Sequence, residues 1–390
     1  MKNIIWSTGH QIKFDNIVNS DNCILFDSKG NKLIDLESGV WCTSLGHNNK
    51  RVNDVITSQI NKITHTGFCY CHPQIDITAS KILEITGIIE GKCEFICSGS
   101  EAVEYGMRIA RAISSKPLAL TFSDSYFGAY GDAVTKNTNQ WHTFNWLECD
   151  CKNKEKGCVG ECDNFRNIPF DEIGIFLFEP GSSSGLVRFP SKELITKIVE
   201  KIRENGGIIM CNEITTGIGR TGKWFGYQHY GFTPDIVAIG KGVGNGYPVS
   251  ITAVSNSVIE QLKDKNFKYS QSHQNDPLGA FVASEVIDII KDDDLIAQCQ
   301  RKGDYLISRL NEIQRKFPSI INQIRGRGLM IVIDFKKQST QIYQQLIERG
   351  FIVAKRPNAE VLRMDPALTI YIQTIDLFLN NLDDIISKIA

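Results

Sequence analysis

A lysine and a pair of polar residues follow two short apolar runs in the middle of the chain. Ile208–Cys211 and Ile236–Ile239 are each long enough for a buried strand and too short for a helix. Asn212–Glu213 follows the first run, and Lys241 comes just after the second. The carboxyl ends of parallel strands face the ligand crevice of an α/β sheet, so we expect these side chains to converge there. Burial lowers the pKa of a lysine, and such an amine can act as a nucleophile in Schiff-base chemistry.

The segment leading to Lys241 carries several motifs in a fixed order. They are Asn212-Glu213-Ile214-Thr215-Thr216-Gly217, Gly219-Arg220-Thr221-Gly222 and Pro234-Asp235. Taken alone, Lys241 fits equally well as a lysine that caps a strand in an ordinary α/β protein. The ordered set makes that alternative a poor explanation. It resembles the class III (subgroup II) aminotransferases, which are pyridoxal-phosphate enzymes of fold type I and are related to glutamate-1-semialdehyde aminomutases and ornithine/acetylornithine aminotransferases.

The resemblance runs from about Asp27 onward and implies an α/β fold of two parts. One is a large domain with a mostly parallel central sheet, and the other is a small α+β domain built from both termini. We expect residues 1–45 to form the N-terminal segment of the small domain and residues 46–285 the large cofactor-binding domain. Residues 286–390 would complete the small domain.

The resemblance also assigns a cofactor site. Gly99 and Ser100 follow a short apolar run and open a helical pattern, an arrangement that points free backbone N–H groups at an anion. They match the family's phosphate cup, and Lys241 matches its Schiff-base lysine. Ser272 stands where the family has a threonine whose hydroxyl reaches the phosphate of the neighbouring subunit. A homodimer with shared active sites follows from that match.

The ring of the cofactor and the substrate have their own expected contacts. The resemblance places the ring between Ile214 and an aromatic residue, for which Tyr126 fits better than Phe127. Trp41 would line the substrate pocket, although ordinary core packing explains it equally well. Arg363 occupies the position of the family's arginine that binds a substrate carboxylate, the alternative being a surface or interdomain salt bridge.

Three further positions depart from the family pattern. Asn212 replaces the aspartate that keeps the pyridine nitrogen protonated, and Thr215 replaces the glutamine that reaches the ring hydroxyl. Glu213 is expected on the opposite face of the strand and so cannot substitute. Ser184 stands in place of a gating glutamate, which argues against ornithine, acetylornithine and related ω-amino substrates.

We therefore expect an aminotransferase that moves an amino group from a donor to a carbonyl acceptor. Because of Asn212, two alternatives stay open: another pyridoxal-phosphate reaction, such as amino migration by an aminomutase or epimerisation, and a non-catalytic cofactor-binding protein.

A cysteine-rich insertion at residues 146–166 is not part of the family pattern. Cys149, Cys151, Cys158 and Cys162 fall in a polar, lysine-rich stretch with few apolar residues. Four thiols so close could bind one structural zinc, which would supply the order that packing cannot. The C-x-C-x6-C-x3-C spacing is unusual, so free thiols and an iron–sulfur cluster remain alternatives.

The composition suits a globular protein with a large core. The chain has 390 residues, of which 42% are hydrophobic, and a formal net charge of −1. This balance gives no electrostatic reason to expect a nucleic-acid partner or an anionic lipid surface. We expect no membrane association, because no apolar run approaches membrane-spanning length. Twelve cysteines without a signal-peptide pattern predict a reduced, cytoplasmic setting.

Overall fold

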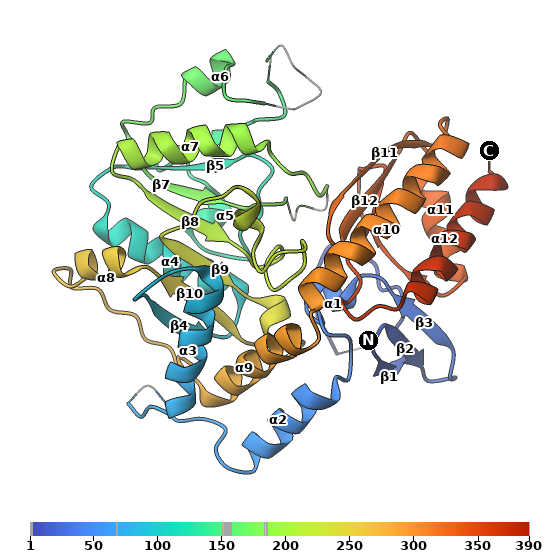
Figure 1. The fold of residues 1–390 in the computed structure, drawn as a ribbon, viewed down its shortest axis with the longest axis horizontal. Helices are drawn as coiled ribbons and strands as arrows, with labels where there is room; N and C mark the ends of the chain where they lie inside the picture. Colours follow the sequence, from blue (N-terminus) through green and yellow to red (C-terminus); the bar gives the residue numbers. More distant parts are fainter. Residues whose placement is uncertain are drawn as a thin grey trace.

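The computed structural model describes residues 3–67, 69–149, 151, 158–182, 184 and 186–389. Its larger part is a seven-stranded sheet with helices on both faces (Figure 1). In spatial order the strands are β4 (Lys92–Ile96), β10 (Ser250–Val254), β9 (Ile236–Ile239), β8 (Ile208–Asn212), β7 (Ile173–Phe178), β5 (Leu118–Phe122) and β6 (Trp141–Phe144). All neighbours pair in parallel except β10, which runs antiparallel to both β4 and β9. The predicted mostly parallel sheet is confirmed.

Helices cover both faces of this sheet, which explains why its strands are almost continuously apolar. In β8, Ile208 and Met210 pack in the same cluster as α4 (Gly99–Ile113). Ile209 and Cys211 face the other layer. That layer contains α3 (Pro73–Thr86), α7 (Lys192–Glu204) and α9 (Pro277–Asp292).

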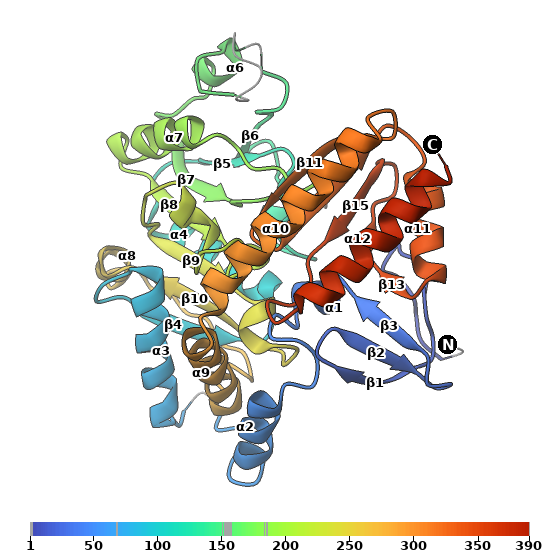
Figure 2. The same ribbon diagram turned by 45° about the vertical axis from the view of Figure 1, so that its right-hand side comes forward.

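Two smaller sheets lie beside the large one (Figure 2). The first has the order β1 (Ile17–Asp21), β2 (Ile24–Asp27), β3 (Lys32–Asp35) and β13 (Phe351–Ile352). The second has the order β11 (Ile321–Arg327), β12 (Met330–Phe335), β15 (Val361–Met364) and β14 (Ala354–Lys355). The long C-terminal helices are α10 (Leu295–Lys316), α11 (Ser339–Glu348) and α12 (Ile372–Ser387). Both views place the N-terminal strands next to these helices.

The remaining helices and 3-10 turns complete the described chain. They are α1 (Ser38–Trp41), α2 (Lys50–Ile60), α5 (Asp132–Thr135), α6 (Asp163–Arg166), α8 (Asn256–Leu262) and the 3-10 turns η2 (Gly226–His229) and η3 (Lys241–Gly244). The boundary predicted between residues 285 and 286 falls within α9, and the division into domains remains a prediction. Within the described residues, no helix has the length and apolar character needed to cross a membrane.

Candidate active site

Lys241 lies at the carboxyl end of β9, as the apolar run before it predicts. It opens η3 with φ 47°, a left-handed backbone conformation that costs free energy in a residue with a side chain. Burial lowers the pKa of its amine. The Lys241 Nζ atom is 5.7 Å from the centre of the Trp41 ring. Burial of this kind favours the neutral, nucleophilic amine.

Asn212 ends the neighbouring strand β8, and its amide is held by backbone groups. Its Nδ2 donates to the Tyr126 carbonyl at 3.0 Å, and its Oδ1 accepts from the Ile214 N–H at 3.2 Å. A carboxylate at this position would place an acceptor against the Tyr126 carbonyl oxygen. The local structure is therefore matched to an amide.

Glu213 lies on the other side of the strand end, as alternation along β8 predicts. Its carboxylate accepts from Thr216 Oγ1 at 2.7 Å and from the backbone N–H groups of Gly226 and Tyr227 at 2.8 Å each. Burial raises its pKa to about 7, although these three donors act in the opposite direction. Glu213 thus fixes the loop after β8 and does not replace the missing aspartate.

One pocket gathers most of the residues that the sequence predicts to bind the cofactor. It is lined by Gly99, Ser100, Val103, Tyr126, Phe127, Gly128, Asn212, Ile214, Thr215 and Lys241. Seven of the eight residues predicted to bind the cofactor are in this set. They come from the ends of β8 and β9, the start of α4 and the loop after β5, which the parallel sheet brings to one edge.

The start of α4 forms the floor of this pocket. Ser98 caps the helix by accepting from the Glu101 N–H at 3.3 Å, and the Glu101 side chain accepts from the Ser98 N–H at 2.7 Å. A Cβ atom on Gly99 would lie 2.9 Å from Ile214 Cγ2, so only glycine allows this close approach. The free N–H groups of a helix start favour an anion.

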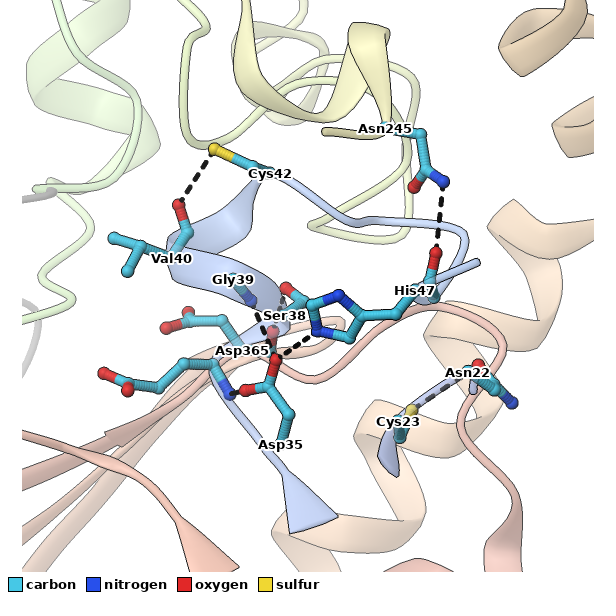
Figure 3. A network of polar contacts seen from close by, with 12 residues as sticks. Asn22, Cys23, Asp35, Ser38, Gly39, Val40, Cys42, His47, Asn245 and Asp365 are labelled. Carbon is cyan, nitrogen blue, oxygen red and sulfur yellow. Dashed lines mark hydrogen bonds and ion pairs between the residues drawn. The ribbon is translucent and has the colours of Figure 1, made fainter. Parts of the chain in front are cut away.

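A left-handed turn places the Trp41 ring near Lys241. Residues 38–41, the segment labelled α1, all have positive φ between 43° and 67°. Asp35 at the end of β3 holds this turn, since its carboxylate accepts from the Glu37 and Gly39 N–H groups at 2.8 and 2.9 Å (Figure 3). His47 Nε2 lies 2.7 Å from the same carboxylate. His47 therefore has a structural contact.

The Arg363 guanidinium stacks on Trp41, the other residue predicted to bind substrate. Its guanidinium carbon is 3.7 Å from the centre of the Trp41 ring. Its Nε donates to Asp365 Oδ2 at 2.6 Å, and both side chains are buried. This contact uses one of the five N–H donors of the guanidinium. Trp41, Lys241 and Arg363 thus share one corner of the site.

Ser272 is exposed and does not line the Lys241 pocket of its own chain. The four cysteines of the insertion lie outside that pocket as well. Their sulfurs are all within 4.8 Å of one another. Residues 150 and 152–157 of the predicted insertion are outside the described part of the chain.

Several site residues were missed by the sequence reasoning. Asp365 pairs with Arg363, Glu179 Oε2 accepts from the Tyr126 N–H at 3.1 Å, and Asp35 anchors the Trp41 turn. Asp365 lies two residues after Arg363 in the sequence, and Asp35 ends an apolar run. Both aspartates are visible in the sequence, but their positions do not show which way either side chain points.

Comparison with known proteins places this geometry in a family. Residues 6–386 match the family described as Aminotransferase class-III. The chain belongs to the class III aminotransferases. The mitochondrial acetylornithine aminotransferase of Saccharomyces cerevisiae is 30% identical over 92% of this chain and 88% of its own length. A leucine/methionine racemase of Thermococcus litoralis is 27% identical over 95% of this chain and 90% of its own length.

Solved structures show the same fold. An S-selective transaminase from Arthrobacter sp. aligns with a TM-score of 0.89 at 22% identity, covering 100% of this chain and 96% of the other. A Bacillus anthracis aminotransferase aligns with a TM-score of 0.88 at 22% identity, covering 99% and 97%. The predicted fold type and family are confirmed, and the chain is a pyridoxal-phosphate-dependent aminotransferase of class III. The aminomutase, epimerase and non-catalytic alternatives are not favoured.

The pocket residues fit the cofactor of this family. The α4 start supplies N–H groups for a phosphate, and Lys241 supplies a buried amine. Thr215 Oγ1 is buried and has no hydrogen-bond partner among the described residues. An unpaired buried hydroxyl that lines a pocket is suited to a polar group of a ligand.

Proposed function

We propose that Lys241 is the residue that binds pyridoxal phosphate covalently and transfers the proton during amino transfer. The observation that carries this proposal is a buried lysine at a strand end, in the same pocket as a helix start and Asn212. When bound, pyridoxal phosphate supplies an aldehyde that holds amines covalently and a ring that accepts negative charge. Burial favours the neutral form of Lys241, so its Nζ can accept a proton from the substrate and return it.

The remaining pocket residues have binding roles in this proposal. Gly99 and Ser100 hold the phosphate with backbone N–H groups of α4. Tyr126 and Ile214 cover the two faces of the ring. Thr215 uses its unpaired hydroxyl for a polar group of the ring.

Asn212 gives this site different electrostatics from a site with aspartate. A carboxylate stabilises a proton on the ring nitrogen, whereas an amide carries no charge. Asn212 Nδ2 has two hydrogens, and one of them is used by the Tyr126 carbonyl. We propose that the second donates to an unprotonated ring nitrogen.

Trp41 and Arg363 form the substrate wall in this proposal. The Arg363 guanidinium suits a donor or acceptor with a carboxylate, and Trp41 covers it with an aromatic face. Ser184 still argues against ω-amino substrates, because no glutamate stands at that position to pair with Arg363.

We propose a homodimer in which Ser272 reaches the phosphate of the neighbouring subunit. Ser272 is exposed and lies outside its own pocket. Its neighbour His273 shares Asp276 with His65, at 2.6 and 2.5 Å. The segment around His65 exposes large apolar side chains, namely Ile60, Ile63, Tyr70 and Ile77. Apolar exposure beside Ser272 supports a second copy of this chain as the partner.

The compartment and the second cofactor are also proposals. All twelve cysteines are free thiols, which supports the reduced cytoplasm as the setting. A zinc ion on the four cysteines would lie apart from the Lys241 pocket, because none of them lines it. We propose that this metal is structural and takes no part in amino transfer.

Borohydride trapping tests the catalytic proposal. The protein is loaded with pyridoxal phosphate, reduced and digested, and we expect the cofactor mass on the peptide that contains Lys241. An amino donor added before reduction should prevent labelling, and the keto product should appear. Lys241→Ala should show neither label nor product, whereas Lys50→Ala, at an exposed lysine of α2, should behave as wild type. Labelling of another lysine, or turnover by Lys241→Ala, would refute the assignment.

A further inference from the structure

The four cysteines of the insertion converge on one point in space. The Sγ atoms of Cys158 and Cys162 are 3.8 Å apart, and those of Cys151 and Cys158 are 4.0 Å apart. All four sulfurs, including that of Cys149, lie within 4.8 Å of one another. A zinc–sulfur bond of about 2.3 Å places the sulfurs of a tetrahedral site about 3.8 Å apart. The thiols are thus close to the spacing of four ligands on one ion.

The sulfur atoms are largely shielded from solvent, as in a metal site whose ligands all come from the protein. Cys151, Cys158 and Cys162 are 6%, 1% and 3% exposed, and Cys149 is half-buried. The Cys151 N–H donates to Cys149 Sγ at 3.3 Å. Backbone N–H groups that point at sulfur offset the negative charge of bound thiolates. Four protein ligands leave no open coordination position, which is the mark of a structural zinc site.

The cluster also attaches the insertion to the large sheet's helix layer. The carbonyl of Cys158 accepts from Ser191 Oγ at 2.6 Å, and Ser191 caps α7 by accepting from the Leu194 N–H at 3.1 Å. Lys197 of α7 pairs with Glu161 at 3.2 Å. The position of the cluster is therefore coupled to the start of α7.

We infer that Cys149, Cys151, Cys158 and Cys162 bind one zinc ion as a tetrathiolate site that holds residues 158–166 against α7. This inference deepens the structural zinc proposed above. An iron–sulfur cluster fits less well, because its cysteines bind different iron atoms and stand farther apart than ligands of a single ion. A disulfide pair fits less well too, since the Cys158–Cys162 and Cys151–Cys158 sulfur distances of 3.8 and 4.0 Å are far longer than the S–S bond of about 2.05 Å, and each sulfur has the three others within 4.8 Å.

Metal analysis of the purified full chain tests the inference. We expect zinc equimolar with the chain after dialysis without chelator, and no comparable iron. Titration of the wild type with a mercurial reagent should release that zinc in proportion to four modified thiols, as read by a metallochromic dye. A chain without zinc, equimolar iron, or zinc retained after these thiols are modified would overturn the inference.

Variants separate this site from other thiols and from the catalytic site. Cys151→Ser combined with Cys158→Ser should lose the zinc. Cys69→Ser combined with Cys71→Ser is the matched control, because these exposed cysteines have the same C-x-C spacing as Cys149 and Cys151, and it should keep the zinc. Zinc retained by the first variant would also refute the site.

Borohydride labelling at Lys241 is measured in the same samples. We expect the zinc-free variant to keep the label at Lys241, because that pocket contains none of the four cysteines. If the zinc-free variant also lost the label at Lys241, this would contradict a structural zinc site that is separate from the Lys241 pocket. Absence of the label in the wild type, with zinc present, would refute the catalytic proposal alone. If the double variant fails to fold, mercurial titration of the wild type still decides the inference.

Discussion

Asn212 makes one hydrogen bond that a carboxylate could not make. Its Nδ2 donates to the Tyr126 carbonyl at 3.0 Å, so Asn212→Asp would place two acceptors face to face. A buried polar group left without its partner costs about 1–3 kcal/mol. We expect the unfolding free energy of the cofactor-free variant to be lower by that amount, so that it unfolds at a lower denaturant concentration. Pyridoxal phosphate should stabilise the variant more than it stabilises the wild type, because a protonated ring nitrogen would then pair with the new carboxylate.

Denaturant titration of both proteins with and without the cofactor checks this expectation. Asn139→Asp, at an exposed position in the turn before β6, is the control for introducing a carboxylate. Equal stabilisation of wild type and Asn212→Asp by the cofactor would show that residue 212 does not contact the ring.

Glu213 makes a prediction about pH. Burial raises its pKa from the usual 4.5 to about 7, so between these values the folded protein binds more protons than the unfolded chain. The stabilisation that comes from the protonated Glu213 carboxyl is present in full below pH 4.5. It is lost as the pH rises to about 7. The size of this loss is roughly 3 kcal/mol.

The variant Glu213→Gln cannot titrate and should lack this decline. The difference in unfolding free energy between wild type and variant should therefore fall across this pH range, as followed by urea denaturation. Glu204→Gln, an exposed substitution, should show no such trend. A pH-independent difference for Glu213→Gln would mean that the carboxyl is already ionised at low pH.

At the scale of elements, the turn of residues 38–41 depends on Asp35. Serine, valine and tryptophan disfavour positive φ, so the turn persists only because hydrogen bonds hold it. Asp35→Asn removes one acceptor and should lower the unfolding free energy by about 1–3 kcal/mol. It should also lower kcat/KM by displacing Trp41, while labelling of Lys241 by pyridoxal phosphate persists.

Steady-state kinetics and thermal unfolding of the same preparations test this expectation. Asp54→Asn, at an exposed aspartate of α2, provides the comparison and should match the wild type. Unchanged kcat/KM with reduced stability would mean that the turn does not shape the substrate wall.

Elements with a strong local pattern could be predicted, and those set by distant contacts could not. The runs Ile208–Cys211 and Ile236–Ile239 are strands because both their faces are buried. The antiparallel direction of β10 has no local signal in the sequence. A buried strand has the same apolar pattern whether it runs parallel or antiparallel to its neighbours. The left-handed turn before Trp41 breaks local preferences and was not foreseen. The pairing of Arg363 with Asp365 needed the tertiary structure, because sequence gives no side-chain direction.

At the scale of the whole molecule, shared active sites make a prediction about mixed dimers. Lys241→Ala lacks the amine, and Ser272→Glu places a negative charge where the proposed dimer holds a phosphate. Each homodimer should be inactive. When the two are unfolded together and refolded, each mixed dimer should contain one intact site, assembled from Lys241 of one subunit and Ser272 of the other.

Regained amino transfer in the mixture, absent from either variant refolded alone, is the expected result. Size-exclusion chromatography with light scattering establishes the oligomeric state. Ser257→Glu, at the start of α8, serves as the control for an added charge and should be active by itself. A mixture without activity, or a monomeric wild type, would exclude sites shared between subunits.

The parallel pairing of β3 with β13 has a consequence for synthesis on the ribosome. Ile34 and Asp35 pair with Phe351 and Ile352, so the first sheet stays incomplete until nearly the whole chain has emerged. Until then β3 presents an unpaired edge, which is a site for mispairing between nascent chains. The turn that carries Trp41 begins directly after this edge. The substrate wall is therefore among the last parts of the molecule to form, although its residues are among the first to be translated.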